Sequence, residues 1–381
     1  MTAIIQPEQF FDGYRMTTNY CLIIEDGKIK DIVKTDDLTE QPIVVRGTLA
    51  PGYIDLQVNG GGGVLFNNQP DIEAIKTISQ AHAKFGSTAI LPTLITDNIS
   101  VMKQAADAVS SAIKQKIPGV LGIHFEGPHL SVTKKGVHSS DFIRPISNAE
   151  LTLYTRQDLG IVMVTLAPEN VSPDQIKTLA EAGVIVCLGH SNANTQTVKS
   201  ALAAGASGFT HLFNAMSPFQ SREPGMVGTA LLDEQSWCGL IVDGHHVHYD
   251  ACKLALKTKE KGKIFLVTDA MAVVGTDEQS FPFFGSKILR SDDRLNALTG
   301  ELAGSCLDMA TAVRNSIYHL GCSFIEASKM ASLYPAEFLG IHRQGHLTVG
   351  ADANFVVLNK DYQVQQTWIN GEMVYQHPSF V

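Results

Sequence analysis

The fold is decided by residues 172–192, which read SPDQIKTLAEAGVIVCLGHSN. Ser172 can cap a helix, proline fits the first helical position, and Gln175 completes a capping box, so we expect a helix to begin here. Gly183 should end that helix, and the apolar run Val184–Leu188 should follow it as a buried strand. A helix joined to a strand that closes in polar residues is the repeating unit of an α/β fold.

Similar apolar runs recur on both sides of this stretch, and each closes in polar or glycine-rich residues. Helical patterns lie between several of them, and Asn194, for example, can cap a helix that ends near Gly205. The eight runs comprise residues 52–57, 88–91, 120–124, 161–164, 184–188, 208–212, 238–242 and 264–267. Eight buried parallel strands alternating with helices predict an α/β fold, a (β/α)8 TIM-like barrel. A doubly wound open sheet is the alternative.

The two ends of the chain are rich in β-forming residues. Asp26-Gly27 near the start and Asn370-Gly371 near the end each lie between two such runs, which is a strong signal for a β-hairpin. We therefore expect one small sheet domain built from residues 1–47 and 345–381. The remaining residues, 48–344, should form the barrel.

The composition restricts the class of protein. The chain has 381 residues, of which 44% are hydrophobic and 18% charged, enough for a barrel core and a second small domain. Its formal net charge of −9 argues against nucleic acid and membrane partners, so a phosphorylated substrate needs a local cationic pocket. The sequence contains no signal-peptide pattern, no long apolar stretch and no C-x-x-C pair. Its six scattered cysteines fit the reducing cytoplasm, which is the location we expect.

Four of the expected strands close in metal-binding or catalytic residue types. These are Glu126 at the third strand, His190 at the fifth, His211 at the sixth and Asp269 at the eighth. In a barrel, catalytic groups lie at the carboxyl ends of the strands, so these side chains should converge at one mouth. Two imidazoles and a carboxylate suit a catalytic zinc or similar ion with a position open for water. The aspartate could then act as general base.

Each of these residues also has a structural interpretation when it is taken alone. A single histidine at a strand end is more often a hydrogen-bonded structural residue, Glu126 could cap a helix, and Asp269 could belong to a turn. The joint pattern on four strands is what favours a site. Three further histidines, His124, His129 and His248, are interpreted as structural or supporting residues. The glycines at 60–63 lack the phosphate-loop pattern, and residues 281–303 are expected to form an inserted hairpin or lid.

Eight segments along nearly the whole chain carry a family resemblance. In order, they are PGYIDLQVNG at 51–60, LPT at 91–93, HFEGP at 124–128, LGHSNA at 188–193, THLFNAM at 210–216, VDGHHV at 242–247, LVTDA at 266–270 and LAGS at 302–305. They resemble signatures of the N-acetylglucosamine-6-phosphate deacetylases of the amidohydrolase superfamily. The resemblance implies a barrel with a small β-sandwich formed by both termini. It also implies a metal-dependent hydrolase of amino-sugar catabolism, which converts N-acetyl-D-glucosamine 6-phosphate to glucosamine 6-phosphate and acetate.

The resemblance also implies roles for individual residues. Glu126, His190 and His211 match the ligands of one divalent metal ion per subunit, for which Zn²⁺ is favoured and which Fe²⁺, Co²⁺ or Mn²⁺ could replace. Asp269 matches the catalytic base and acid, and His138 matches a residue that helps to polarise the substrate carbonyl. The matches to sugar-phosphate contacts are Val137, His138, Asn214, Ala215, Arg222, Asp243, His246, Leu302, Ala303 and Gly304. Some members bring phosphate-binding groups across a dimer interface, so a homodimer is implied.

The end of strand one departs from the wider superfamily, in which H-x-H binds a second metal. Gln57-Val-Asn59 stands there instead, and neutral amides are poor zinc ligands beside imidazole, so we expect one tightly bound metal. Arg222 is the natural phosphate partner because its guanidinium can bind two oxygens at once, although an ordinary surface ion pair is the alternative. Three other functions stay open: an N-acetylgalactosamine-6-phosphate deacetylase, a cyclic-amide hydrolase and a non-catalytic sugar-phosphate sensor. The missing H-x-H argues against the second, and the complete ligand set argues against the third.

Overall fold

Eight parallel strands form the centre of the molecule in the computed structural model, which describes residues 2–378. They are β6 (Tyr53–Val58), β9 (Ser87–Ile95), β10 (Gly122–Glu126), β11 (Ile161–Leu166), β12 (Ile185–Leu188), β13 (Gly208–Phe209), β14 (Trp237–Leu240) and β15 (Ile264–Leu266). Their order in the sheet follows the chain from β6 to β15. Where the last strand meets the first, the Asp269 N–H donates to Gln57 O over 3.0 Å. The expected (β/α)8 barrel is therefore confirmed, and the doubly wound alternative is wrong.

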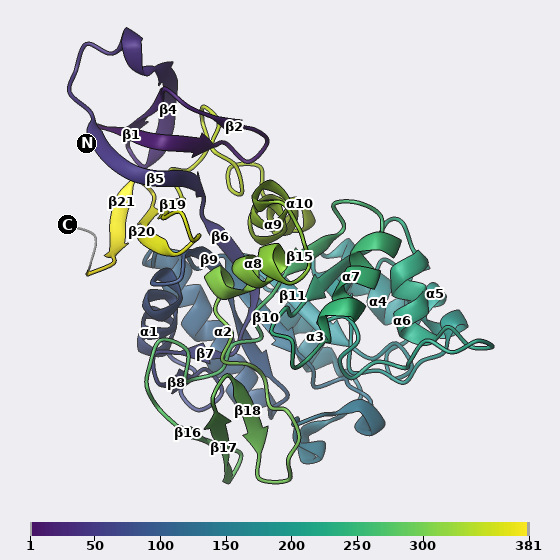
Figure 1. Cartoon of the computed structure of the whole chain (residues 1–381). Coiled ribbons are helices and arrows are strands. Elements are labelled where there is room, and N and C mark those ends of the chain that lie inside the picture. Colours follow the sequence, from purple (N-terminus) through teal and green to yellow (C-terminus); the bar gives the residue numbers. More distant parts are fainter. Residues whose placement is uncertain (1, 379–381) are drawn as a thin grey trace.

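Helices lie on the outside of the barrel, and the first seven connect its strands (Figure 1). They are α1 (Ile72–Ala83), α2 (Ile99–Lys114), α3 (Asn148–Tyr154), α4 (Pro173–Glu181), α5 (Thr195–Ala203), α6 (Gly225–Leu232), α7 (Tyr249–Thr258), α8 (Met309–Tyr318), α9 (Phe324–Ala331) and α10 (Leu333–Leu339). Ser172 and Gln175 form the expected capping box at the start of α4, and the Asn194 side chain caps α5. Among the helices of residues 2–378, none has the length and apolar character that a membrane crossing requires.

Several barrel strands differ in extent from the runs seen in the sequence, and two of them extend further towards the site. β9 continues past its expected end through Pro92, although proline has no N–H to donate to a strand ladder. The β6–β9 register shifts at this point, and the Val58 N–H donates to Thr93 Oγ1 instead, over 2.9 Å. β10 likewise continues to Glu126. Both extensions carry the strand ends further towards the mouth of the barrel.

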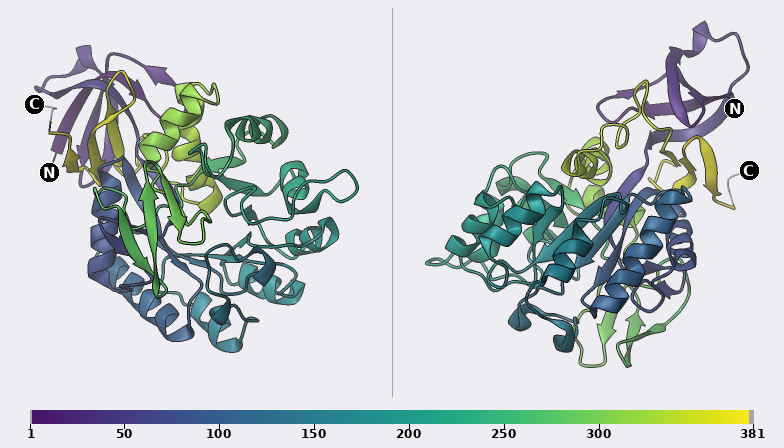
Figure 2. Two further views of the ribbon diagram at one scale, coloured as in Figure 1. Left: turned by 60° about the horizontal axis from the view of Figure 1, so that its bottom comes forward. Right: turned by 180° about the vertical axis from the view of Figure 1, so that it is seen from behind.

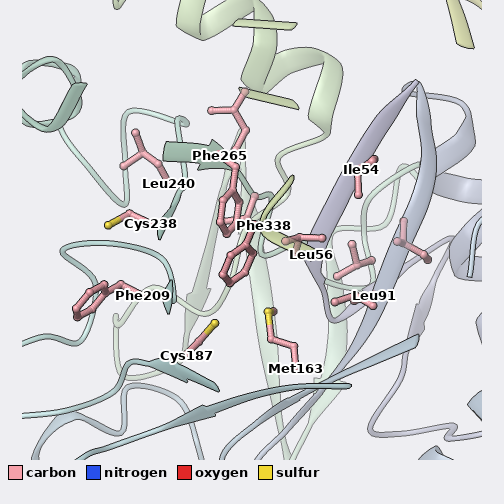
Figure 3. Close-up of a cluster of buried hydrophobic side chains, with 14 of the residues drawn as sticks. Ile54, Leu56, Leu91, Met163, Cys187, Phe209, Cys238, Leu240, Phe265 and Phe338 are labelled. Atoms are coloured by element: carbon pink, nitrogen blue, oxygen red, sulfur yellow. The ribbon is translucent and has the colours of Figure 1, made fainter. Parts of the chain in front are cut away.

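Apolar side chains fill the interior of the barrel (Figure 3). Leu56, Met163 and Cys187 come from three different strands and are each at most 3% exposed. At the same cluster, Phe265 of β15 stacks on Phe338 of α10, with ring centroids 5.0 Å apart. Because apolar side chains fill this interior, the polar groups gather at the carboxyl ends of the strands.

Strands from both termini form one hydrogen-bonded sheet beside the barrel (Figures 1 and 2). They are β1 (Thr2–Phe11), β2 (Met16–Thr17), β3 (Tyr20–Glu25), β4 (Lys28–Lys34), β5 (Ile43–Pro51), β19 (Phe355–Leu358), β20 (Val364–Ile369) and β21 (Glu372–Gln376). Both expected hairpins are present, and their turn residues Asp26, Gly27, Asn370 and Gly371 have φ of 50°, 76°, 50° and 74°. The division at residues 47 and 345 stays a prediction, because β5 passes into β6 with only Gly52 between them.

Residues 280–297 form a three-stranded antiparallel sheet, which we call the flap. Its strands are β16 (Ser280–Phe283), β17 (Ser286–Ser291) and β18 (Arg294–Ala297). Its buried side chains, including Phe281 and Ile288, pack with Ile95 and Met271 at the mouth of the barrel. A small two-stranded sheet of β7 (Gly60–Gly61) and β8 (Val64–Leu65) lies on the same side (Figure 1). The segment expected as an inserted hairpin or lid is therefore a small sheet packed at the barrel mouth.

Candidate active site

Side chains from three strand ends meet around one point at the mouth of the barrel. Glu126 is the last residue of β10, while His190 and His211 follow β12 and β13. Glu126 Oε1 lies 3.2 Å from His190 Nε2 and 3.0 Å from His211 Nε2, and the two Nε2 atoms are 3.0 Å apart. The predicted convergence of these residues is present, although the roles given to them stay predictions.

The geometry and chemistry of this triangle fit a tetrahedral metal ion. Ligand bonds of about 2.0–2.1 Å in a tetrahedral site place neighbouring ligand atoms about 3.3 Å apart. His190 Nδ1 lies 2.9 Å from the Lys134 carbonyl oxygen, which can only accept, so its Nε2 carries a lone pair. Burial alone would raise the pKa of Glu126, but the two neighbouring imidazoles lower it well below its usual value. A carboxylate and two imidazoles are therefore available to a divalent cation.

His138 lies beside the same triangle and also places a ring nitrogen within 4.8 Å of ligand atoms of Glu126 and His190. The Thr96 backbone N–H faces His138 Nδ1 at 3.4 Å, and Thr96 Oγ1 lies 2.8 Å from the same atom. Because a backbone N–H can only donate, His138 Nδ1 accepts and its Nε2 carries the hydrogen. We therefore assign the third ligand position to His211, and His138 presents an N–H donor instead. Burial and the neighbouring His190 lower the pKa of His138 well below its usual value, which keeps this ring neutral.

Asp269 follows β15 and is bound on one oxygen by two amides. Asn59 Nδ2 donates to Asp269 Oδ1 over 2.6 Å, and Gln57 Nε2 donates to it over 3.2 Å and to Glu126 Oε1 over 3.1 Å. Among residues 2–378, no donor reaches Asp269 Oδ2, so this oxygen is free to exchange a proton. Burial and the nearby charge of Glu126 raise the pKa of Asp269 to about 6, close to the range in which a general base works well.

Three of the residues at the strand ends have unusual backbone conformations. His190, His211 and Asp269 have φ of 47°, 36° and 53°, a left-handed region that residues other than glycine rarely adopt. Such conformations cost free energy and gather at functional sites, where the surrounding structure enforces them. Here Glu169 accepts from the Ser191 hydroxyl and the Asn192 N–H over 2.5 and 2.7 Å, which fixes the loop directly after His190.

These residues open into a cavity of about 170 Å³. It is lined by Asn59, Ile95, Glu126, Gly136, Val137, His138, His190, His211, Asn214, Ala215, His246, Asp269, Met271, Leu302 and Gly304. Most of the residues singled out from the sequence therefore reach one cavity. Asp243 lies behind His246 and accepts from its Nδ1 over 2.6 Å, while Ala303 is fully buried.

Arg222 is a third predicted contact that does not line the cavity. It lies exposed on the loop between Pro218 and Pro224, with no hydrogen bond or ion pair to any residue of the described range 2–378. Phe219 on the same loop is 64% exposed. One chain alone therefore does not bring this guanidinium to the cavity.

Several residues that line the cavity or contact its lining were not assigned a role from the sequence. Gln57 lies in β6 and Asn59 directly follows the strand, and the one-residue spacing places both on the same side. This spacing is the signal that could have identified them as partners of Asp269. Thr96 follows β9, and its contact with His138 joins residues 42 positions apart. No local pattern announces such a contact. Ile95 and Met271 read as ordinary core residues, yet they form part of the cavity wall.

Comparisons with known proteins agree with this geometry. The model of the amidohydrolase family matches residues 48–374. An N-acetylgalactosamine-6-phosphate deacetylase of Shewanella sp. (strain ANA-3) is 48% identical over 365 residues, which cover 94% of this chain and 93% of that protein. An N-acetylglucosamine-6-phosphate deacetylase of Haemophilus influenzae is 36% identical over 369 residues, with 95% and 96% covered. The crystal structure of the N-acetylglucosamine-6-phosphate deacetylase from Pasteurella multocida is similar with a TM-score of 0.95 and 35% identity, covering 99% of this chain and 100% of that one. From the strand-end geometry and these matches together, the chain belongs to the amidohydrolase family of metal-dependent hydrolases.

Proposed function

We propose that this enzyme removes the acetyl group from N-acetylglucosamine 6-phosphate and releases glucosamine 6-phosphate and acetate. The observation that carries the proposal is the meeting of Glu126, His190 and His211 with Asp269 in one cavity. Relatives named as deacetylases of amino-sugar 6-phosphates, at 48% and 36% identity, support the same reaction.

The mechanism assigns one task to each group. A divalent metal held by Glu126, His190 and His211 would polarise the acetamide carbonyl and make water a stronger acid. Asp269 Oδ2 takes a proton from the water that adds to the carbonyl carbon, and His138 Nε2–H donates to the carbonyl oxygen as it gains charge. The carbon–nitrogen bond then breaks, and Asp269 passes its proton to the leaving nitrogen. Acetate and the free amine are the products.

We propose one metal ion per subunit, with Zn²⁺ as the favoured ion because two imidazoles and a carboxylate form a common catalytic zinc site. The NH₂ groups of Gln57 and Asn59 point to the carboxylates of Glu126 and Asp269. An NH₂ group cannot bind a cation, and this orientation supports a single metal. No lysine is among the residues that line the cavity, which disfavours a cyclic-amide hydrolase with a bridging lysine.

The sugar phosphate is proposed to lie against Asn214, Ala215 and His246, with Asp243 holding the His246 ring. We propose that the enzyme is a homodimer in which Arg222 reaches the phosphate bound by the partner subunit. The exposure of Arg222 together with Phe219 on one loop supports this arrangement. A cytoplasmic location completes the proposal, since all six cysteines are free.

N-acetylgalactosamine 6-phosphate is a second candidate substrate. The relative with that name is 48% identical to this chain, whereas the Haemophilus protein named for the glucosamine sugar is 36% identical. The two sugars differ only in the configuration of the 4-hydroxyl. A comparison of kcat/KM on both decides between them.

The test is acetate release by the purified protein, coupled to elemental analysis of its metal. We expect equimolar acetate and free amine from N-acetylglucosamine 6-phosphate, about one metal ion per chain, and a much lower kcat/KM for unphosphorylated N-acetylglucosamine. Protein that contains metal but releases no acetate from either sugar phosphate would contradict the proposal.

A further inference from the structure

One buried polar atom at the cavity has no partner. Asn59 is 1% exposed and lines the cavity, and its Oδ1 accepts no hydrogen bond from any residue between 2 and 378. A buried carbonyl oxygen without a donor costs free energy, and native structures rarely leave one unless a ligand or water completes it. This oxygen is therefore a candidate contact for a bound molecule.

The side chain of Asn59 is held in one orientation. Its Nδ2 donates to Asp269 Oδ1 over 2.6 Å, and because an ionised carboxylate can only accept, the NH₂ group must face Asp269 and the oxygen must face away. The backbone is fixed as well, since the Asn59 N–H donates to Ala270 O over 2.9 Å and Asn59 O accepts from the Phe66 N–H over 2.9 Å. The free oxygen is thus a preorganised acceptor beside Asp269.

The position of this acceptor selects a donor on the substrate. Asp269 is the group that delivers a proton to the leaving nitrogen in the proposed reaction, so that nitrogen must come close to Asp269 and hence to Asn59. We propose that Asn59 Oδ1 accepts a hydrogen bond from the nitrogen of the scissile amide and then from the amine of the product. This inference rests on the proposed function and adds a residue that binds the reacting nitrogen.

The contact should strengthen as the reaction proceeds. The substrate amide offers one neutral N–H, whereas the protonated product amine offers several donors with a positive charge, and charge-assisted hydrogen bonds are roughly twice as strong as neutral ones. Holding the N–H at Asn59 leaves the lone pair that develops on nitrogen free for the proton of Asp269. Asn59 would therefore favour the amine-bound state over the amide-bound state.

Calorimetric binding of two stable ligands to the metal-loaded protein tests the contact. Glucosamine 6-phosphate carries the amine, and 2-deoxyglucose 6-phosphate has only hydrogens at the same carbon. We expect the wild-type protein to prefer the amine, and Asn59→Ala to lower that preference about tenfold, as loss of a charge-assisted hydrogen bond predicts. Asn59→Leu, which keeps the volume of the side chain, should give the same loss and guards against a folding defect in the alanine variant.

Asn67 provides the matched control. It is a buried asparagine outside the cavity wall whose oxygen accepts from the Ile95 N–H and whose NH₂ donates to Ile95 O and Asp97 Oδ2. Asn67→Ala should leave the ratio of the two dissociation constants unchanged. Equal weakening of both ligands in the Asn59 variants, or loss of metal from them, would overturn the inference. If the wild-type protein prefers the amine through Asn59 but releases no acetate, the contact is supported and only the proposed function is contradicted.

Discussion

The two halves of the cavity differ in how much of each a single chain supplies. At the strand ends, Glu126 Oε1 and the Nε2 atoms of His190 and His211 lie within 3.2 Å of one another, and all three residues are buried. At the loops, His246 and Asn214 line the cavity while Arg222 is exposed to solvent. The barrel fixes the first group, because hydrogen-bonded neighbouring strands determine where their ends lie. The second group depends on loop conformation and, as we propose, on a second copy of the chain.

The largest effect should come from the strand-end half. Asp269→Asn keeps the shape of the side chain but cannot accept the proton from water, so kcat should fall by about 10²–10⁴-fold. Acetate release measures the loss, and elemental analysis should find the metal retained, because Asp269 is not one of the three ligands. Asp308→Asn is a control for loss of a partly buried carboxylate, since Asp308 caps α8 and does not line the cavity. Near-normal turnover by Asp269→Asn would remove Asp269 from its role.

Mixing two variants tests whether the two halves of one cavity come from different subunits. Arg222→Ala should raise KM for the sugar phosphate by about 10–100-fold, as loss of a charged contact to phosphate predicts, with a far smaller change for the unphosphorylated sugar. If Arg222 serves the partner subunit, hybrid dimers with Asp269→Asn contain one intact site. A 1:1 mixture of the two inactive variants should then recover about a quarter of the wild-type rate at low substrate concentration. No recovery after verified subunit exchange would place Arg222 outside the partner's site.

A smaller loss of turnover should follow from changing Thr96, whose backbone N–H and hydroxyl both contact His138 Nδ1. Thr96→Val removes the hydroxyl at 2.8 Å from His138 Nδ1 and leaves only the weaker backbone contact at 3.4 Å. We expect kcat to fall about tenfold with little change in KM, because the N–H of His138 acts on the developing charge. Thr96→Ser should restore most of the rate. A rate for Thr96→Val equal to that of the wild type would contradict this account.

Local chemistry explains which parts of the fold could be predicted. The start of α4 and the turns at Asp26-Gly27 and Asn370-Gly371 depend on neighbouring residues only, and all three are present in the structure. The continuation of β9 through Pro92 could not be predicted, since it depends on a register shift against β6 and on the hydroxyl of Thr93. Strand ends in a barrel share one mouth, and this regularity allowed distant residues to be placed together from their order alone.

The contacts among the site residues could not be predicted from neighbouring residues in the sequence. Nothing near Thr96 in the sequence indicates His138, and the spacing of Gln57 and Asn59 indicates a shared side but not that the Gln57 amide also contacts Glu126. These contacts depend on side chains that meet only after the barrel closes. The exposure of Arg222 was also hidden, because a sequence gives the charge of a loop residue but not the chain that it contacts.

Asp55 should have the smallest effect on turnover and a clear effect on stability. It is fully buried beneath the site and accepts from Thr268 Oγ1 over 2.5 Å and from the N–H groups of Gln57 and Thr268 over 3.2 and 3.3 Å. Burial raises the pKa of Asp55 to about 7 despite these hydrogen bonds. Asp55→Asn keeps an oxygen for both N–H groups and offers its NH₂ to Thr268 Oγ1, so kcat should change by less than about threefold.

The stability difference between Asp55→Asn and the wild type should depend on pH, because the Asp55 carboxyl binds its proton more tightly in the folded state than in the unfolded state. Between the unfolded pKa of 3.8 and the folded value of about 7, the native carboxyl holds a proton that the unfolded chain has released. The contribution of Asp55 to the free energy of unfolding therefore falls as pH rises through this window. Above pH 7 the loss of stability is complete. Asparagine does not titrate, so the Tm of Asp55→Asn relative to wild type should rise by several degrees from pH 5 to pH 8. A Tm difference that stays constant across this range would mean that burial does not hold the proton on Asp55, and the seam between β6 and β15 would then tolerate a charge.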